Sequence, residues 1–135
     1  MTIKTRLATA ALVAVSGALV MIVILLTDGM GSIKKPDLPF IWAAGAGAGM
    51  AGLLVAPLFG RAGRYRNLWA MAGAVLATTL GAALAGVMME PGMIGAALII
   101  APVFVGAALF EYPVSGLTWL LSMWLIHVSA RAMRG

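Results

Sequence analysis

The chain reads LATAALVAVSGALVMIVILLT from Leu7 to Thr27, a stretch that contains no charged side chain. A helix rises about 1.5 Å per residue and needs about 20 mostly apolar residues to cross the hydrocarbon core of a bilayer. Lys4 and Arg6 precede the stretch, as basic residues precede the apolar region of a signal peptide. The run is longer than that region, however, and no obvious small-residue cleavage pattern follows it. The sequence therefore predicts an uncleaved first transmembrane helix.

Further apolar stretches follow at residues 40–59 and 68–89, and neither contains a charged residue. The remainder is an apolar run that ends at Phe110, a turn signal over 111–116, and a second apolar run with two tryptophans. One helix through both runs would be about 54 Å long, too long for a core of about 30 Å. We therefore expect a single all-α domain over residues 1–135, a polytopic bundle of four or five transmembrane helices with short loops. The predicted helices are residues 7–27, 40–59, 68–89, 93–110 and 116–130.

The composition agrees with this fold class, since 63% of the residues are hydrophobic and only 10% are charged. A soluble domain of this length needs more polar residues to cover its surface. The net charge of +5 is a feature of some nucleic-acid-binding proteins. Here the basic residues stand in short clusters between apolar stretches, which is typical of membrane topology signals. We expect membrane lipid around the chain and no nucleic acid as a partner.

Basic residues also predict the orientation, because loops rich in lysine and arginine stay in the cytoplasm. With a cytoplasmic N-terminus, a last helix that spans gives five basic residues inside and four outside. A last helix that stays in the interface keeps Arg131 and Arg134 inside and gives seven against two. Charge therefore favours four spans, whereas the apolar surface of the last segment favours five. We prefer five spans, in a bacterial inner (cytoplasmic) membrane, and we expect the N-terminus in the cytoplasm in either case.

Small residues recur at helical spacing in the second and third stretches. Gly45, Gly49 and Gly52 share one face, as do Gly73 and Gly81. Such seams let helix backbones approach closely, which strengthens packing where lipid supplies no hydrophobic drive. We predict that these five glycines pack helices of the chain against each other. An interface with a second copy or with another membrane protein is the alternative.

Few residues of the chain are suited to chemistry. The absence of cysteine excludes disulfides and thiolate sites, and the four acidic residues all lie in predicted loops or at predicted helix ends. His127 is the only histidine, and we expect it to snorkel to the interface near Trp124, with ligation of a haem or pigment as a weak alternative. The sequence thus predicts no catalytic residue, no metal site and no cofactor, and we do not expect an enzyme.

Arg61, Arg64 and Arg66 form the most basic loop, which we expect to fix the topology. Contact of these arginines with anionic lipid or an acidic partner is the alternative. Hydroxyls are scarce in mid-helix, and we expect those of Thr78 and Thr79 to bond to their own helix rather than to line a pore.

Two functions fit these features. The first is a non-catalytic accessory or assembly subunit of a larger membrane complex, which needs no buried charge and no soluble domain. The second is a small homo-oligomeric channel or transporter for an uncharged or hydrophobic solute. The first is preferred, because few polar groups are available to line a path through the membrane.

Overall fold

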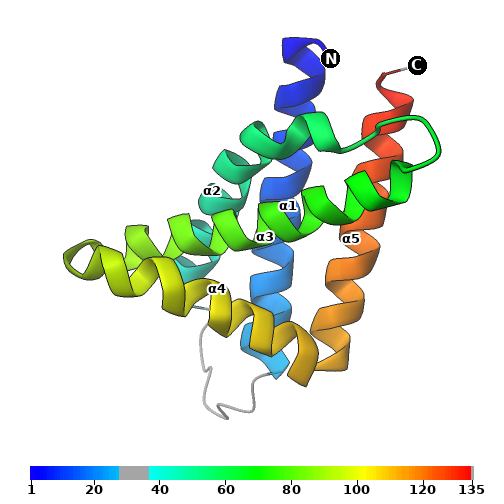
Figure 1. The fold of residues 1–135 in the computed structure, drawn as a ribbon. Coiled ribbons are helices and arrows are strands. Elements are labelled where there is room, and N and C mark those ends of the chain that lie inside the picture. The colour runs from blue at the N-terminus through cyan, green and yellow to red at the C-terminus, as the bar shows by residue number, and fades with distance from the viewer. Residues whose placement is uncertain (28–36, 135) are drawn as a thin grey trace.

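The computed structural model describes residues 1–27 and 37–134, which form five helices long and apolar enough to cross a membrane (Figure 1). The helices are α1 (Ile3–Thr27), α2 (Leu38–Val55), α3 (Arg66–Met89), α4 (Ile94–Glu111) and α5 (Pro113–Ala132). Two single turns of 3₁₀ helix, η1 (Ala56–Leu58) and η2 (Pro91–Met93), follow α2 and precede α4. The described residues include no strand. The chain is a multi-pass membrane protein of the all-α class, as the sequence predicts.

The helix ends differ from the predicted ones by a few residues, and each difference has a local cause. α1 begins at Ile3 because the Thr2 hydroxyl accepts the Thr5 N–H at 3.2 Å and so caps the first turn. α2 ends at Val55 because Pro57 has no N–H to give to the Leu53 carbonyl. Arg6 Nη2 donates to that carbonyl instead, at 3.0 Å.

The turn before the last helix is shorter than predicted. Pro113 is the first residue of α5, where its fixed φ suits a helix and its missing N–H costs nothing. Only Tyr112 separates α4 from α5. The proline and glycine of the predicted turn 111–116 therefore belong to the last helix.

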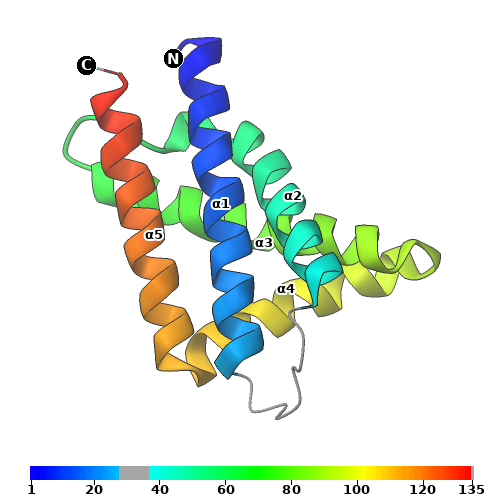
Figure 2. The same ribbon diagram turned by 180° about the vertical axis from the view of Figure 1, so that it is seen from behind.

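α1 and α5 lie side by side and run in opposite directions, so the N- and C-terminal ends meet at the same end of the molecule (Figures 1 and 2). Thr27 Oγ1 and Ser115 Oγ lie 3.2 Å apart where α1 ends and α5 begins. α2 packs on α1, and α3 packs on α2. α3 begins near the end that carries the termini, and α4 finishes at the opposite end (Figure 1). Together, α3 and α4 lead from the end with the termini to the opposite end of the molecule.

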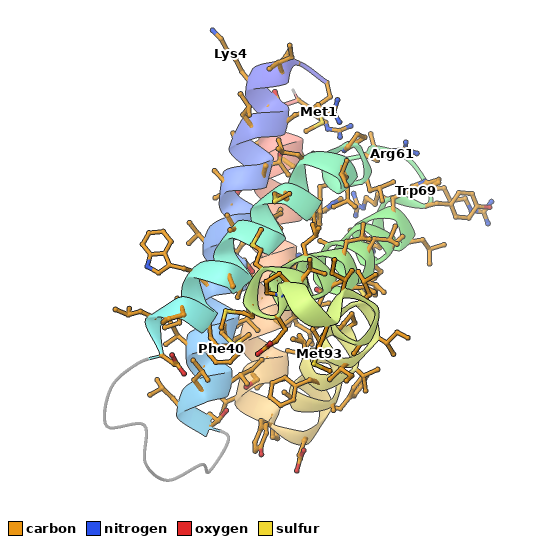
Figure 3. All side chains as sticks on the ribbon, turned by 90° about the vertical axis from the view of Figure 1, so that its left-hand side faces the viewer. Met1, Lys4, Phe40, Arg61, Trp69 and Met93 are labelled. Carbon is orange, nitrogen blue, oxygen red and sulfur yellow. The ribbon has the colours of Figure 1, made fainter. Side chains whose placement is uncertain are left out.

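This arrangement separates the charges of the described residues. Asp37 directly precedes α2, Glu111 ends α4, and Glu90 lies in the turn between α3 and α4, so none of these acidic residues lies at the end with the termini. The end with the termini carries Lys4, Arg6, Arg61, Arg64, Arg66, Arg131 and Arg134 (Figures 1 and 3). α5 therefore runs the length of the molecule and still returns its arginines to the N-terminal end. The sequence-based alternatives did not include this arrangement, because both treated α3 and α4 as separate crossings.

The small-residue faces lie between helices of the chain itself. A Cβ added at Gly49 would lie 3.1 Å from Ala14 Cβ of α1, and one at Gly52 would lie 2.9 Å from Val13 Cβ. Gly45 faces α1 in the same way. On α3, Gly81 lies against Ala48, and Gly73 lies against the Leu58 and Phe59 side chains.

A second face of α2 carries the closest approach to α3. Gly47 lies so close to α3 that a Cβ there would overlap the Gly81 carbonyl oxygen. The sequence pattern did not single out Gly47, because it lies between the predicted seam positions. α2 thus uses glycine on two faces and is held between α1 and α3.

Candidate functional site

A cavity of about 630 Å³ lies among the helices, and all five contribute to its wall. α1 packs on α2 and α5, whereas α4 packs mainly on α3, which leaves space between α1 and the α3–α4 hairpin. Many of the side chains that line this space from α3 and α4 are small, among them Ala77, Gly81, Ala97 and Ala101. The volume lies within the range of about 300–1,000 Å³ that is usual for small-molecule sites.

Ser16 of α1 is the polar group deepest in this wall. Its side chain is 5% exposed, and its hydroxyl has no hydrogen-bond partner among the described residues. Helical hydroxyls ordinarily bond to the carbonyl four residues earlier. The hydroxyls of Thr9, Thr27, Thr78 and Thr118 do so here at 2.7–2.9 Å. Ser16 is therefore a buried hydroxyl without a hydrogen-bond partner among the described residues, on a helix that lines the cavity.

Thr78 and Trp119 form the wall on the side of α3 and α5. Thr78 Oγ1 donates to the Ala74 carbonyl at 2.9 Å, as the sequence predicts, and accepts the Trp119 Nε1–H at 2.7 Å. Thr78 and Trp119 also line a second cavity of about 510 Å³ between α3, α4 and α5. Thr79 lines this second cavity too, and its hydroxyl does not form the predicted bond to its own helix. The hydrogen-bonded pair thus stands between the two cavities.

The mouth of the first cavity carries acidic and aromatic side chains. Asp37 and Glu90 line the cavity and are exposed, so they lie at its rim. Phe40 of α2 and Met93 of η2 also line it and lie on one face of the molecule (Figure 3). No lysine, arginine or histidine lines it among the described residues.

The predicted basic loop lies away from this cavity. Arg61 donates through Nε to the Pro57 carbonyl at 3.1 Å and stacks on the Trp69 ring at 4.3 Å from its centroid (Figure 3). Arg134 Nη2 donates to the same carbonyl at 3.0 Å. Burial, and then the charge of Arg61, lower the pKa of Arg134 below its usual value. These arginines satisfy carbonyls at the end of α2 and η1, while Arg64 and Arg66 are exposed.

His127 lies in the interior instead of snorkelling to the interface. Its side chain is 7% exposed, and its Nδ1 accepts the Gly60 N–H at 3.1 Å. Gly60 has a φ of +70° and lies against the backbone of Ala130 and Arg131, so its N–H reaches into the bundle. His127 therefore fastens the loop after η1 to α5, which leaves only Nε2 for a ligand.

The described residues include no group of three histidine or acidic side chains that could hold a metal ion. The chain matches no protein-family model, no curated protein and no solved structure.

Proposed function

We propose that the chain is a small membrane transporter that binds a hydrophobic solute in the cavity between α1 and the α3–α4 hairpin. The observation that carries this proposal is the cavity of about 630 Å³ with the buried, unpartnered hydroxyl of Ser16 in its wall. An unmade hydrogen bond of a buried hydroxyl costs about 1–3 kcal/mol. A solute with a carbonyl or hydroxyl at this depth recovers that cost.

Selectivity for such a solute has to come from shape and from Ser16. Lipid tails are as apolar as the wall, so the hydrophobic effect does not favour the solute over lipid. The wall is closely packed behind the cavity, because Gly17 and Ala48 lie against each other where α1 meets α2. A rigid wall and one polar contact distinguish one apolar molecule from another by fit.

The accessory-subunit function stays a second proposal without a structural observation of its own. That function was inferred partly from faces of small residues that would be available to pack against another membrane protein. Gly45, Gly49, Gly52, Gly73 and Gly81 all lie against other helices or turns of the chain. The preference between the two functions is therefore reversed relative to the sequence-based one.

We also propose that the end with both termini faces the cytoplasm of a bacterial inner membrane. Seven basic residues gather there, and cytoplasmic ends of membrane proteins carry an excess of lysine and arginine.

A fluorescence experiment in lipid nanodiscs tests binding. Phenylalanine replaces three of the four tryptophans, so that Trp119 in the cavity wall is the only tryptophan excited, and a bromoalkanol serves as a neutral quencher. We expect saturable quenching. Ala96→Phe narrows the cavity and should weaken binding several-fold, whereas Ala107→Phe, exposed on the same helix and outside both cavities, should not.

Ser16→Ala separates the polar contact from the fit. It should weaken binding of the bromoalkanol and leave binding of the matching bromoalkane unchanged. Quenching that rises linearly with concentration, and equally in the Ala96→Phe and Ala107→Phe variants, would show only dissolution in lipid and refute the proposal. Migration of the native protein in a large complex with fixed partners would favour the accessory-subunit function.

A further inference from the structure

We propose that the solute of this cavity is an amphipathic cation, whose apolar body lies among the helices and whose positive head lies at the rim between Asp37 and Glu90. This inference rests on the proposed function and names the chemical class of its solute.

The two carboxylates at the rim come from different elements. Asp37 directly precedes α2, and Glu90 directly follows α3. Neither side chain caps the helix beside it, and neither forms an ion pair with a described residue. Both therefore present their charge at the mouth of the cavity.

The surrounding charges favour a cation at this mouth. The described lining includes no basic side chain, and the described basic residues lie toward the end with the termini. A low-dielectric wall focuses the field of the carboxylates into the cavity instead of spreading it through water. The two described carboxylates at the rim attract a positive head and repel a negative one.

Aromatic side chains continue the same preference inward. Phe40 lies one turn after Asp37, and Phe104 and Trp119 also line the cavity. The faces of aromatic rings attract cations by about 0.5–2 kcal/mol each, the more so where water is excluded. Met89 and Met93, at the same rim, are flexible and polarisable and adapt to heads of different shape.

The inner wall is apolar over most of its surface. α1 contributes seven residues to it, among them Ser16, which is buried and without a partner among the described residues. A molecule with a charged end at the carboxylates and an apolar body along this wall matches the lining. That description fits an amphipathic amine or another organic cation.

Two ions of almost equal size and opposite charge test the sign of the head. Binding of tetraphenylphosphonium and tetraphenylborate to the full chain in nanodiscs is measured by quenching of Trp119. The change in affinity between variants is compared, so that partition of each ion into lipid cancels. Asp37→Asn with Glu90→Gln should weaken phosphonium binding by about tenfold, as expected for the loss of two partly exposed charge contacts. The same change should strengthen borate binding or leave it unchanged.

Glu111→Gln is the matched control, since Glu111 is an exposed carboxylate that lies outside both cavities. It should change neither affinity, and raised salt should weaken phosphonium binding only while Asp37 and Glu90 are present. If Ala96→Phe weakens both ions but the double variant changes neither, the cavity binds solutes and the cationic head is refuted. If Ala96→Phe has no effect on either ion, the proposed function itself fails.

Discussion

Gly47 is the position where the close approach of α2 and α3 is most easily tested. An alanine there places a methyl group against the Gly81 carbonyl oxygen and 2.9 Å from the Ala85 amide nitrogen. Both obstacles are backbone atoms of α3, so no side chain can rotate away. The two helices have to separate, and every dispersion contact along their interface weakens as they do.

The magnitude follows from two opposing effects. Overpacking of a well-packed interior costs about 1–3 kcal/mol, and the upper value applies because the backbone is blocked. Alanine is preferred over glycine in a helix by about 1 kcal/mol, which offsets part of that cost. We expect Gly47→Ala to lower the free energy of unfolding by about 2 kcal/mol. Gly106→Ala in α4 provides the control, because a Cβ there meets nothing within 4 Å.

Reversible unfolding in mixed micelles, titrated with sodium dodecyl sulfate and followed by circular dichroism, measures both variants. Gly106→Ala should be neutral or slightly stabilising, so the two identical substitutions should differ in sign. If Gly47→Ala is as stable as Gly106→Ala, α2 and α3 do not approach as the structure describes, and the account of the bundle is wrong.

Three further predictions follow from single contacts. Thr78→Val leaves the Trp119 indole N–H without its acceptor in an apolar wall, which should cost about 1–3 kcal/mol in the same unfolding assay. Gly60→Ala forces a left-handed φ on alanine and presses its methyl group on the α5 backbone, which should cost about 3 kcal/mol or more. The chain has no cysteine, so single introduced cysteines can report the topology. An impermeant thiol reagent should label cysteines at Thr2 and Met133 from one side of the membrane and a cysteine at Glu111 only from the other side.

The helices could be predicted because length and hydropathy are local properties. All five predicted segments are helical, with ends shifted where Thr2 caps α1 and where Pro113 starts α5. Of the two hydroxyls predicted to bond to their own helix, that of Thr79 does not, and that of Thr78 does. Its second bond, from Trp119, joins residues 41 positions apart and left no signal in the sequence.

The cavity could not be predicted, because it arises from how helices diverge. The predicted small-residue seams lay in α2 and α3, and their glycines pack against neighbouring helices or turns. Gly81 packs on α2, yet Gly81 also lines the cavity, and Ala96 and Ala101 line it where α4 leaves α1. The same residue type permits a close contact or leaves a space, and only the directions of the helices decide which. The burial of the Ser16 hydroxyl could not be predicted for the same reason, since it depends on neighbours far away in sequence.

The same dependence on helix direction explains why charge and hydropathy disagreed over the last helix. Counting one crossing for each apolar segment puts Arg131 and Arg134 opposite the N-terminus, and keeping them with the N-terminus then requires an interfacial last helix. In the structure, α3 and α4 turn at Glu90 and together lead from the end with the termini to the opposite end (Figure 1). α5 then runs back beside α1, and Arg134 Nη2 lies 3.2 Å from Met1 Sδ. The α3–α4 hairpin also diverges from α1, so the place of the last arginines in the fold and the cavity both follow from the directions of α3 and α4.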